Sequence, residues 1–421
     1  MKISYFQQVP YRHMPDDLGQ RGESVVTVNY HDHVRPDLVH DAYRNALDEL
    51  MYAARAGFDA IAVTEHGQSS YDMSPNPSLL ASTVAYATDV ENLNVGIYPV
   101  GRSLGKAREP LRVAEEYAMV DAISGGRLIA GFPVGLAYDA HLNNGVPPIE
   151  ARARYAENLA LVLRAWQSRE PFTWNGRFAQ HGTVNIWPRP VQNPHPPVWV
   201  TGIGTPSSIA TALEVGYGYN YFGWFGANVT GKRIMDRFWG IAEQMGVEPN
   251  PYRLGFMQTV GVAETDAEAD RLYGPHTEYF FRNCIGNIPL QRMALPGMAD
   301  PTGLKMMLTD PGDFGVYPMM TSWDFAQFKQ AGSIIVGSPE TVRAQLTELA
   351  TTLRFGNLHA MLQFGSMPHD MAQRNIDLFA REVMPHLKTL WGDSDYEHRW
   401  WPERLGGRPT AVTTKLEVAA R

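Results

Sequence analysis

The sequence predicts an α/β fold, a (β/α)8 or TIM barrel with a long insertion between the late strands. Short, continuously apolar runs alternate with amphipathic helical stretches along the 421 residues, and this alternation is typical of parallel strands covered by helices. Eight runs have the length of strands, which favours a closed barrel over an open sheet. No Gly-x-Gly-x-x-Gly motif follows the first run, which further disfavours a dinucleotide-binding sheet.

The first half of the chain follows the alternation regularly. We expect strands at residues 2–9, 59–64, 93–100 and 127–132, and helices at 35–58, 76–88, 110–123 and 148–166. Leu47, Leu50 and Ala54 recur at spacings of three and four, so the first of these helices has one apolar face. Asn76 is the expected N-cap of the second helix, with Pro77 in its first turn.

The second half of the chain is less regular. Further strands are expected at 198–201, 217–222, 254–263 and 358–364, and a proline-rich hairpin region at 170–197. Residues 283–332, rich in Gly, Pro and Met, are too long for an ordinary loop, so we expect a functional insertion or lid there. We expect one barrel domain over residues 1–390 and a charged, tryptophan-bearing tail over 391–421.

Composition narrows the class of protein. A net charge of −8 without any run of Lys or Arg argues against a nucleic-acid partner. The single cysteine, Cys284, excludes a disulfide within the chain and suits a reducing cytoplasm. No apolar stretch has the length of a signal peptide core or a membrane span, so we expect neither export nor a membrane partner.

The second predicted strand ends in Glu65 and His66. Active sites of barrels form on the loops that follow the strands, so the imidazole of His66 is expected at the mouth, where it could move protons near neutral pH. Glu65 beside it could fix the His66 tautomer or contact a ligand. The alternative is a hydrogen-bonded strand end without a catalytic role.

A loop rich in glycine and hydroxyl groups follows the fifth predicted strand. Its expected ligand-binding residues are Gly202, Gly204, Thr205, Ser207 and Ser208. Glycines let the backbone approach a ligand closely, and the hydroxyls add donors to the free N–H groups at the start of the next helix, which attract phosphate. The alternative is a helix cap with a flexible turn.

Two other strand ends carry proline. The third strand ends in Tyr98 and Pro99, where proline could stop strand pairing or mark a cis peptide bond. The fourth is followed by Pro133, Val134 and Gly135, another loop suited to close approach of a ligand.

The stretch His31-Asp32-His33 raises the question of a metal site. Metal-dependent barrel hydrolases carry such a motif at the end of the first strand, with further ligands on later strands. Here the motif lies in a long loop, and no second cluster is apparent at the other strand ends. We therefore expect no metal, and a metal-dependent hydrolase is only a remote alternative.

Several separated stretches together resemble the bacterial-luciferase-like family of flavin-dependent monooxygenases, which includes alkanal, alkane and alkanesulfonate monooxygenases. The resemblance covers about residues 1–390 and depends on the order and spacing of short stretches at 60–66 (AIAVTEH), 76–77 (NP), 124–128 (SGGRL), 198–202 (VWVTG), 335–340 (IVGSPE) and 377–385 (DLFAREVMP).

The resemblance implies roles for several of the candidate site residues. His66 matches the catalytic histidine of the family, and the loop at 202–208 matches the one that holds the flavin phosphate. Tyr98-Pro99 falls where the family has a cis peptide bond beneath the flavin ring. Tyr155 resembles a position that contacts the flavin.

Two departures from the family pattern matter. Many members carry an arginine where this chain has Val134, so the cation that balances a phosphate must come from elsewhere; Arg102, Arg152 and Arg154 are candidates. The reactive cysteine of true luciferases near Pro133 is absent, so light emission is not implied.

The function implied by the resemblance is a two-component monooxygenase. It would use reduced FMN from a separate flavin reductase and O2, through a C4a-peroxyflavin, to oxidise a small organic substrate, and it would be a cytoplasmic homodimer. Such chemistry needs a dry pocket, to which Trp224, Phe225 and the methionines of the insertion (Met293, Met298, Met306 and Met307) could contribute. Two alternatives on the same fold are a deazaflavin (F420)-dependent oxidoreductase and a non-catalytic flavin-binding protein.

Overall fold

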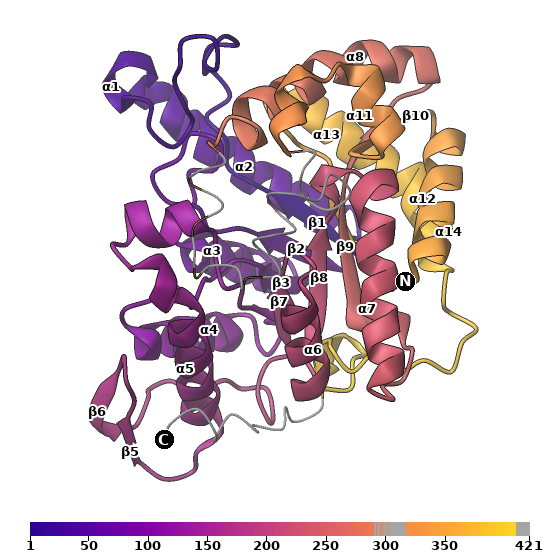
Figure 1. The fold of residues 1–421 in the computed structure, drawn as a ribbon. Helices are drawn as coiled ribbons and strands as arrows, with labels where there is room; N and C mark the ends of the chain where they lie inside the picture. Colours follow the sequence, from indigo (N-terminus) through magenta and orange to yellow (C-terminus); the bar gives the residue numbers. More distant parts are fainter. Residues whose placement is uncertain (290–291, 293–294, 296, 298–300, 302–316, 410–421) are drawn as a thin grey trace.

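The computed structural model describes residues 1–409 except 290–291, 293–294, 296, 298–300 and 302–316. It contains a parallel barrel surrounded by helices (Figure 1), as the sequence predicts. The barrel strands, in spatial and chain order, are β1 (Lys2–Gln7), β2 (Ala60–Val63), β3 (Gly96–Pro99), β4 (Ala130–Gly131), β7 (Val198–Thr201), β8 (Gly218–Phe222), β9 (Leu254–Val262) and β11 (Asn357–Met361).

The first and last strands of the barrel are neighbours. β11 pairs with β1 in register from Lys2 opposite Asn357, which joins the last strand to the first. Between β3 and β4 the ladder is short: Ile97 bridges Leu128, and Ile97 exchanges backbone hydrogen bonds of 2.9 Å with Arg127 and Ile129. The barrel is therefore nearly closed, with its weakest pairing at this seam.

The four helices expected in the first half of the chain are present as α2 (Pro36–Arg55), α3 (Pro77–Val90), α4 (Pro110–Ile123) and α5 (Pro148–Gln167). The second half of the barrel is surrounded by further helices, α6 (Pro206–Val215), α7 (Lys232–Gln244), α12 (Pro339–Leu353), α13 (His369–Leu378) and α14 (Met384–Lys388). Asn76 caps α3 as predicted, because its side chain accepts a hydrogen bond from the Ser78 N–H. None of the helices in the described ranges is long and apolar enough to cross a membrane.

The region between β9 and β11 contains elements that the sequence did not predict. α8 (Asp266–Tyr279) and α11 (Phe325–Ala331) precede an additional strand, β10 (Ile334–Gly337), which pairs with the second half of β9. β9 can hold this extra partner because it is nine residues long. Most of residues 290–316, with the four methionines predicted to contribute to the pocket, lies outside the described residues.

The proline-rich region forms the predicted hairpin, β5 (Phe172–Asn175) paired antiparallel with β6 (Gln180–Val184). The expectation of a cis bond at Tyr98-Pro99 is wrong, since the cis bonds among the described residues are Trp187–Pro188 and Asn193–Pro194. Pro99 continues the parallel ladder of β3 in register with Val63, and an extended strand there takes the ordinary trans bond.

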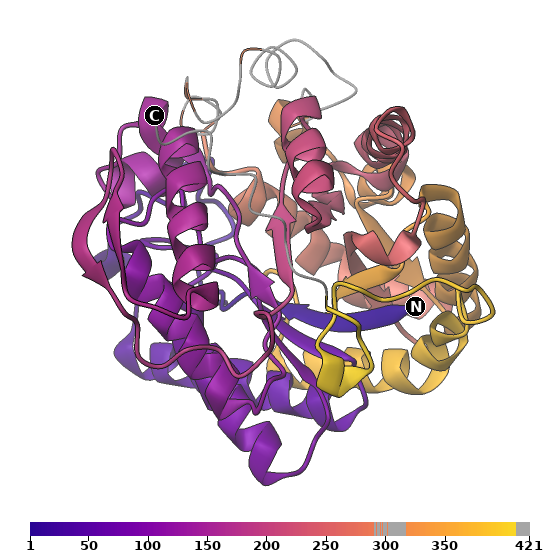
Figure 2. The ribbon, with the colours of Figure 1, turned by 90° about the horizontal axis from the view of Figure 1, so that it is seen from below.

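The C-terminal segment, residues 391–409, packs against the amino end of the barrel. Figure 2, the view from below, shows this yellow segment crossing beside the start of β1. The indole of Trp199 in β7 donates to the Trp400 carbonyl at 2.8 Å, and Asn250 donates to the Glu397 carbonyl at 2.8 Å. The tail therefore covers one end of the barrel, while the loops after the strands surround the other end. The domain boundary at residue 390 stays a prediction.

Candidate active site

A cavity of about 380 Å³ lies among the loops at the carboxyl ends of the strands. Such a volume lies in the range of pockets that bind small molecules. Most residues predicted for the site line this cavity: Glu65, His66, Pro133, Val134, Gly135, Tyr155, Gly202, Thr205, Ser207 and Ser208. The barrel therefore brings together loops that follow β2, β4 and β7, and they are far apart in sequence.

Three predicted site residues do not line the cavity. Tyr98 points into the barrel interior, where its hydroxyl bonds to the Asn220 side chain and burial raises its pKa. The carbonyl of Pro99 accepts from the Tyr117 hydroxyl at 3.1 Å. Gly204 is buried; it has a φ of +83°, and a Cβ there would collide with Ile234.

His66 forms a pair with an aspartate that the sequence did not reveal. Its Nδ1 lies 3.1 Å from Asp139 Oδ2 and 3.2 Å from the Tyr138 hydroxyl. Asp139 begins a π-helical turn, Asp139–Asn143, in the long connection between β4 and α5. A carboxylate in a loop after a barrel strand is a signal that could have identified it, but nothing in the sequence fixes its contact with His66.

The Asp139 carboxylate is buried yet well supported. Its Oδ1 accepts from the Asn143 amide at 2.9 Å and from the Gly67 N–H at 3.3 Å. Burial acts to raise the pKa of Asp139, but Lys106 and His66 beside it hold that pKa below its usual value. The structure therefore presents His66 with an ionised partner.

Glu65 points away from His66 and into a set of cations. Its Oε1 accepts from Arg102 at 2.6 Å, and its Oε2 accepts from the Ser103 N–H at 2.7 Å. Arg102 also donates to Glu116, so two carboxylates neutralise its charge. Arg102, one candidate for balancing a phosphate, is therefore engaged elsewhere.

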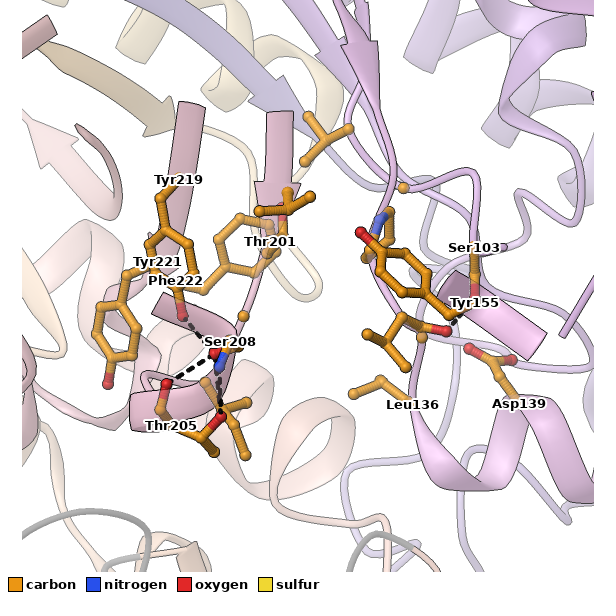
Figure 3. Close-up of a pocket in the computed structure, with 18 of the residues that line it drawn as sticks. Ser103, Leu136, Asp139, Tyr155, Thr201, Thr205, Ser208, Tyr219, Tyr221 and Phe222 are labelled. Carbon is orange, nitrogen blue, oxygen red and sulfur yellow. Dashed lines mark hydrogen bonds between the residues drawn. The ribbon is translucent and has the colours of Figure 1, made fainter. Parts of the chain in front are cut away.

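The loop after β7 presents a cluster of hydroxyl groups at the start of α6 (Figure 3). Thr205 Oγ1 donates to Ser208 Oγ at 3.0 Å and caps the helix by accepting from the Ser208 N–H. Tyr219 OH lies 3.4 Å from Ser208 Oγ and accepts from the Gly204 N–H at 3.0 Å. Hydroxyls grouped at a helix N-terminus suit an anion.

Two arginines lie near this hydroxyl cluster. Burial raises the pKa of the Tyr219 hydroxyl, and the guanidinium groups of Arg237 and Arg152 oppose that rise because they are close to it. Arg237 also donates to the Gly204 carbonyl at 2.9 Å, and Arg152 lines the cavity. Arg154, by contrast, pairs with Glu150 at 2.9 Å and lies over a phenylalanine ring.

The remainder of the lining is largely apolar. Trp224 and Phe225, expected to contribute to a dry pocket, do line the cavity, and so do Phe222, Ile285 and Ile288. Figure 3 shows Phe222 and Tyr221 on the same side as the hydroxyl cluster, with Tyr155, Leu136 and Asp139 on the opposite side. Tyr155 is anchored by its hydroxyl, which donates to the Phe132 carbonyl at 3.0 Å.

The motif at 31–33 forms a short helix, α1 (Tyr30–His33), with His33 Nε2 3.6 Å from Glu23. Within the described part of the chain, no group of three or more His, Cys, Asp or Glu side chains is arranged to hold a metal ion.

The fold is a parallel barrel with a cavity among the loops at the carboxyl ends of its strands. The profile of the luciferase-like monooxygenases matches residues 24–354, and the chain belongs to that family, whose members are oxidoreductases.

Individual relatives indicate which cofactors occur around this fold. This chain is 30% identical to the oxygenase component of a flavin-dependent trigonelline monooxygenase from Acinetobacter baylyi. The match extends over 177 residues, which are 41% of this chain and 47% of the relative. The solved oxygenating constituent of 3,6-diketocamphane monooxygenase from Pseudomonas putida, in complex with FMN, covers 91% of this chain and 98% of its own at 20% identity, with a TM-score of 0.66. The solved structure of an F420-dependent secondary alcohol dehydrogenase matches 92% of this chain and 98% of its own chain at 17% identity, with a TM-score of 0.62.

Proposed function

We propose that this protein is the oxygenase of a two-component system, which uses reduced FMN and O2 to oxidise a small organic substrate. One observation carries the proposal: the hydroxyl cluster, Arg152 and the His66–Asp139 pair line a single cavity, and Arg237 lies close to the hydroxyl cluster. Such a cavity suits a long ligand with a phosphate at one end and a reacting ring at the other. The relative from Acinetobacter baylyi, named as an oxygenase component, supports a separate flavin reductase as partner.

The residues present fit FMN. Thr205, Ser207 and Ser208 would hold the phosphate, and Arg152 with Arg237 would balance its charge in place of the arginine absent at Val134. Pro133, Gly135 and Tyr155 would line the path of the ring. When bound, the reduced flavin supplies the electrons that activate O2 for transfer of one oxygen atom to the substrate.

The chain itself contributes proton handling and exclusion of water. His66 lines the cavity and would move a proton at its Nε2, while Asp139 holds Nδ1. Trp224, Phe225 and Ile288 would keep the reacting centre dry, which protects a reactive oxygen species from discharge by water.

An F420-dependent reductase on the same fold is the rival function, supported by the alcohol dehydrogenase of similar structure. Purified protein with reduced FMN supplied by a reductase, and separately with reduced F420, distinguishes the two when oxygen uptake and product are measured with isotopically labelled O2. We expect uptake and labelled product only with FMN. Turnover with reduced F420 in the absence of oxygen, and none with FMN, would overturn the proposal.

His66→Ala provides the site test within the same assay. We expect turnover to fall roughly 100-fold or more, in the range of a lost general acid or base, while FMN affinity is retained. Unchanged turnover would remove His66 from the mechanism.

We propose further that the protein is a cytoplasmic homodimer. Helices α3 and α4 pack side by side and carry exposed apolar side chains. These are Leu79, Tyr86 and Val90 on α3 and Met119 and Ile123 on α4. Exposed apolar side chains gathered on neighbouring helices are typical of a protein interface. The cytoplasmic location rests on the single cysteine.

A further inference from the structure

Lys106 lies between two buried carboxylates at the edge of the cavity. Its Nζ is 3.8 Å from Glu65 Oε2 and 3.8 Å from Asp139 Oδ1, and only 5% of its side chain is exposed. We propose that Lys106 and Asp139 are positioning residues that fix His66 as the tautomer with its proton on Nδ1, which directs the basic Nε2 into the cavity. The inference about the tautomer is independent of the proposed function, whereas its expected effect on turnover rests on that function.

Two hydrogen-bond arrangements compete at His66 Nδ1. In one, Nδ1–H donates to Asp139 Oδ2 at 3.1 Å; in the other, the Tyr138 hydroxyl donates to a bare Nδ1 at 3.2 Å. The second arrangement would leave the nitrogen lone pair facing a carboxylate. A bond to an ionised acceptor is about twice as strong as one between neutral groups, so the first arrangement wins while Asp139 is ionised.

The Tyr138 hydroxyl has a second hydrogen-bond partner, which competes with its hydrogen bond to His66. It lies 2.5 Å from the Tyr71 hydroxyl, and the Tyr71 ring lies 4.9 Å from the imidazole. Tyr138 can donate to only one acceptor at a time, whereas Asp139 can accept from His66 without giving up a proton. The tyrosine pair therefore confines the imidazole ring without setting its tautomer.

The charge of Asp139 depends on Lys106. Burial raises the pKa of a carboxyl group and favours its protonated form, and Lys106 is the largest influence that lowers the pKa of the buried Asp139. Lys106 also separates Asp139 from the negative charge of Glu65, which Arg102 and the Ser103 N–H hold in place. The order Arg102, Glu65, Lys106, Asp139, His66 is thus a row of alternating charge that ends at the imidazole.

Nε2 of His66 is left for the ligand. It makes no hydrogen bond with any residue in the described ranges, and His66 lines the cavity. A histidine fixed through one nitrogen by a carboxylate presents the other nitrogen as a base of defined direction.

The test is the ¹⁵N spectrum of flavin-free protein labelled at histidine, with the His66 signals assigned by their loss in His66→Gln. At a pH where the ring is neutral, found from the titration of the same signals, we expect the proton on Nδ1 and a bare Nε2. A proton on Nε2 would overturn the proposal. This measurement needs no flavin, oxygen or substrate, so its failure is separate from failure of the proposed oxygenase activity.

Variants then test the part played by each positioning residue. Asp139→Asn should move the proton to Nε2 and lower kcat by roughly 100-fold or more, as loss of the correct tautomer does in other enzymes, with KM for the substrate little changed. Lys106→Met should shift the tautomer in the same direction, and Lys106→Arg should restore it. Lys329→Met removes a lysine paired with Asp270 away from the cavity and should leave the signals unchanged. A Lys106→Met protein that keeps the Nδ1 proton would contradict the role of Lys106.

Discussion

The Glu65 carboxylate accepts a hydrogen bond of 2.6 Å from the Arg102 guanidinium, and both side chains are largely buried. This bond ties the end of β2 to the loop that follows β3, since the Ser103 N–H of the same loop donates to the second carboxylate oxygen at 2.7 Å. Glu65 and Arg102 were each candidates for direct ligand contact. Their mutual contact instead makes them a support for the two loops that carry His66 and Lys106.

We predict that Glu65→Ala lowers the free energy of unfolding by about 3 kcal/mol, because removing one member of a buried ion pair leaves the other charge uncompensated. Arg102→Met should have a similar effect, and the double variant should cost less than the sum of the two. Urea unfolding of the three variants measures this. Asp41→Asn, at an exposed pair with Arg44, is the control and should leave stability unchanged; strict additivity would contradict the coupling.

The loop at 202–208 predicts a difference between two flavins. Ser208→Ala removes a hydroxyl that contacts Thr205 and Tyr219, and we expect about tenfold weaker FMN binding, the value of one hydrogen bond to a charged group. Riboflavin lacks the phosphate, so its affinity should stay the same. Fluorescence titration of wild type and variant with both ligands measures this; equal weakening of FMN and riboflavin would place the phosphate elsewhere.

Local periodicity accounts for most of what the sequence predicted. The apolar spacing in α2 and the Asn76-Pro77 start of α3 are properties of neighbouring residues, and both appear in the structure. β10 was missed although the β-branched residues Ile334, Ile335 and Val336 are typical of a strand, because it pairs with the far half of β9 outside the ring of eight strands that the sequence predicted. Strand pairing of this kind is a tertiary contact that no single window of sequence contains.

The site was predictable loop by loop but not contact by contact. Asp139 lies 73 residues from His66 in the chain, so their pairing depends on how the loops after β2 and β4 fold against each other. Tyr98 was placed in the site from its position at a strand end, whereas the alternation of side chains along β3 turns it into the barrel toward Asn220. Arg237 escaped notice because it comes from α7, beyond the loop it supports.

The apolar face of α3 and α4 predicts the oligomeric state. Tyr86 is 67% exposed near the middle of that face, and Tyr86→Glu should convert a dimer to a monomer by burying a charge in the interface. Sedimentation analysis of wild type and variant measures this. A monomeric wild type, or a variant that remains dimeric, would exclude this face as the interface.

Arg127 predicts a large loss of stability at a site far from any ligand. Its guanidinium is buried and donates to Ser124, Thr88 and Val95 at 2.7 to 3.0 Å, among other acceptors. We expect Arg127→Met to lower the free energy of unfolding by about 3 kcal/mol or more, because several buried acceptors lose their donors. Arg112→Met, on the exposed face of α4, is the matched control in urea unfolding, and an equal effect of both would contradict the argument.

Asp72 predicts a dependence of stability on pH. Burial raises its pKa from 3.8 to about 6, although His66 and the Thr64 hydroxyl oppose the rise. Between these two values the unfolded chain has lost the proton and the folded chain keeps it, so stability falls as pH rises, by roughly 1.4 kcal/mol per pH unit at most. Above about 6 the penalty is complete and constant.

Asp72→Asn should abolish that loss. The asparagine carbonyl can still accept from the Val9 N–H, and its amide can donate to the Thr64 hydroxyl. We therefore expect the variant to gain stability relative to wild type as pH rises from 3.8 to about 6, measured by urea unfolding at a series of pH values. Asp37→Asn is the control: Arg35 lowers the pKa of the exposed Asp37 carboxylate below 3.8, so above that value the carboxylate is increasingly ionised in both the folded and the unfolded chain, and the difference in stability between this variant and wild type should change little over the same rise. A difference between Asp72→Asn and wild type that does not change with pH would show that Asp72 ionises normally in the folded protein.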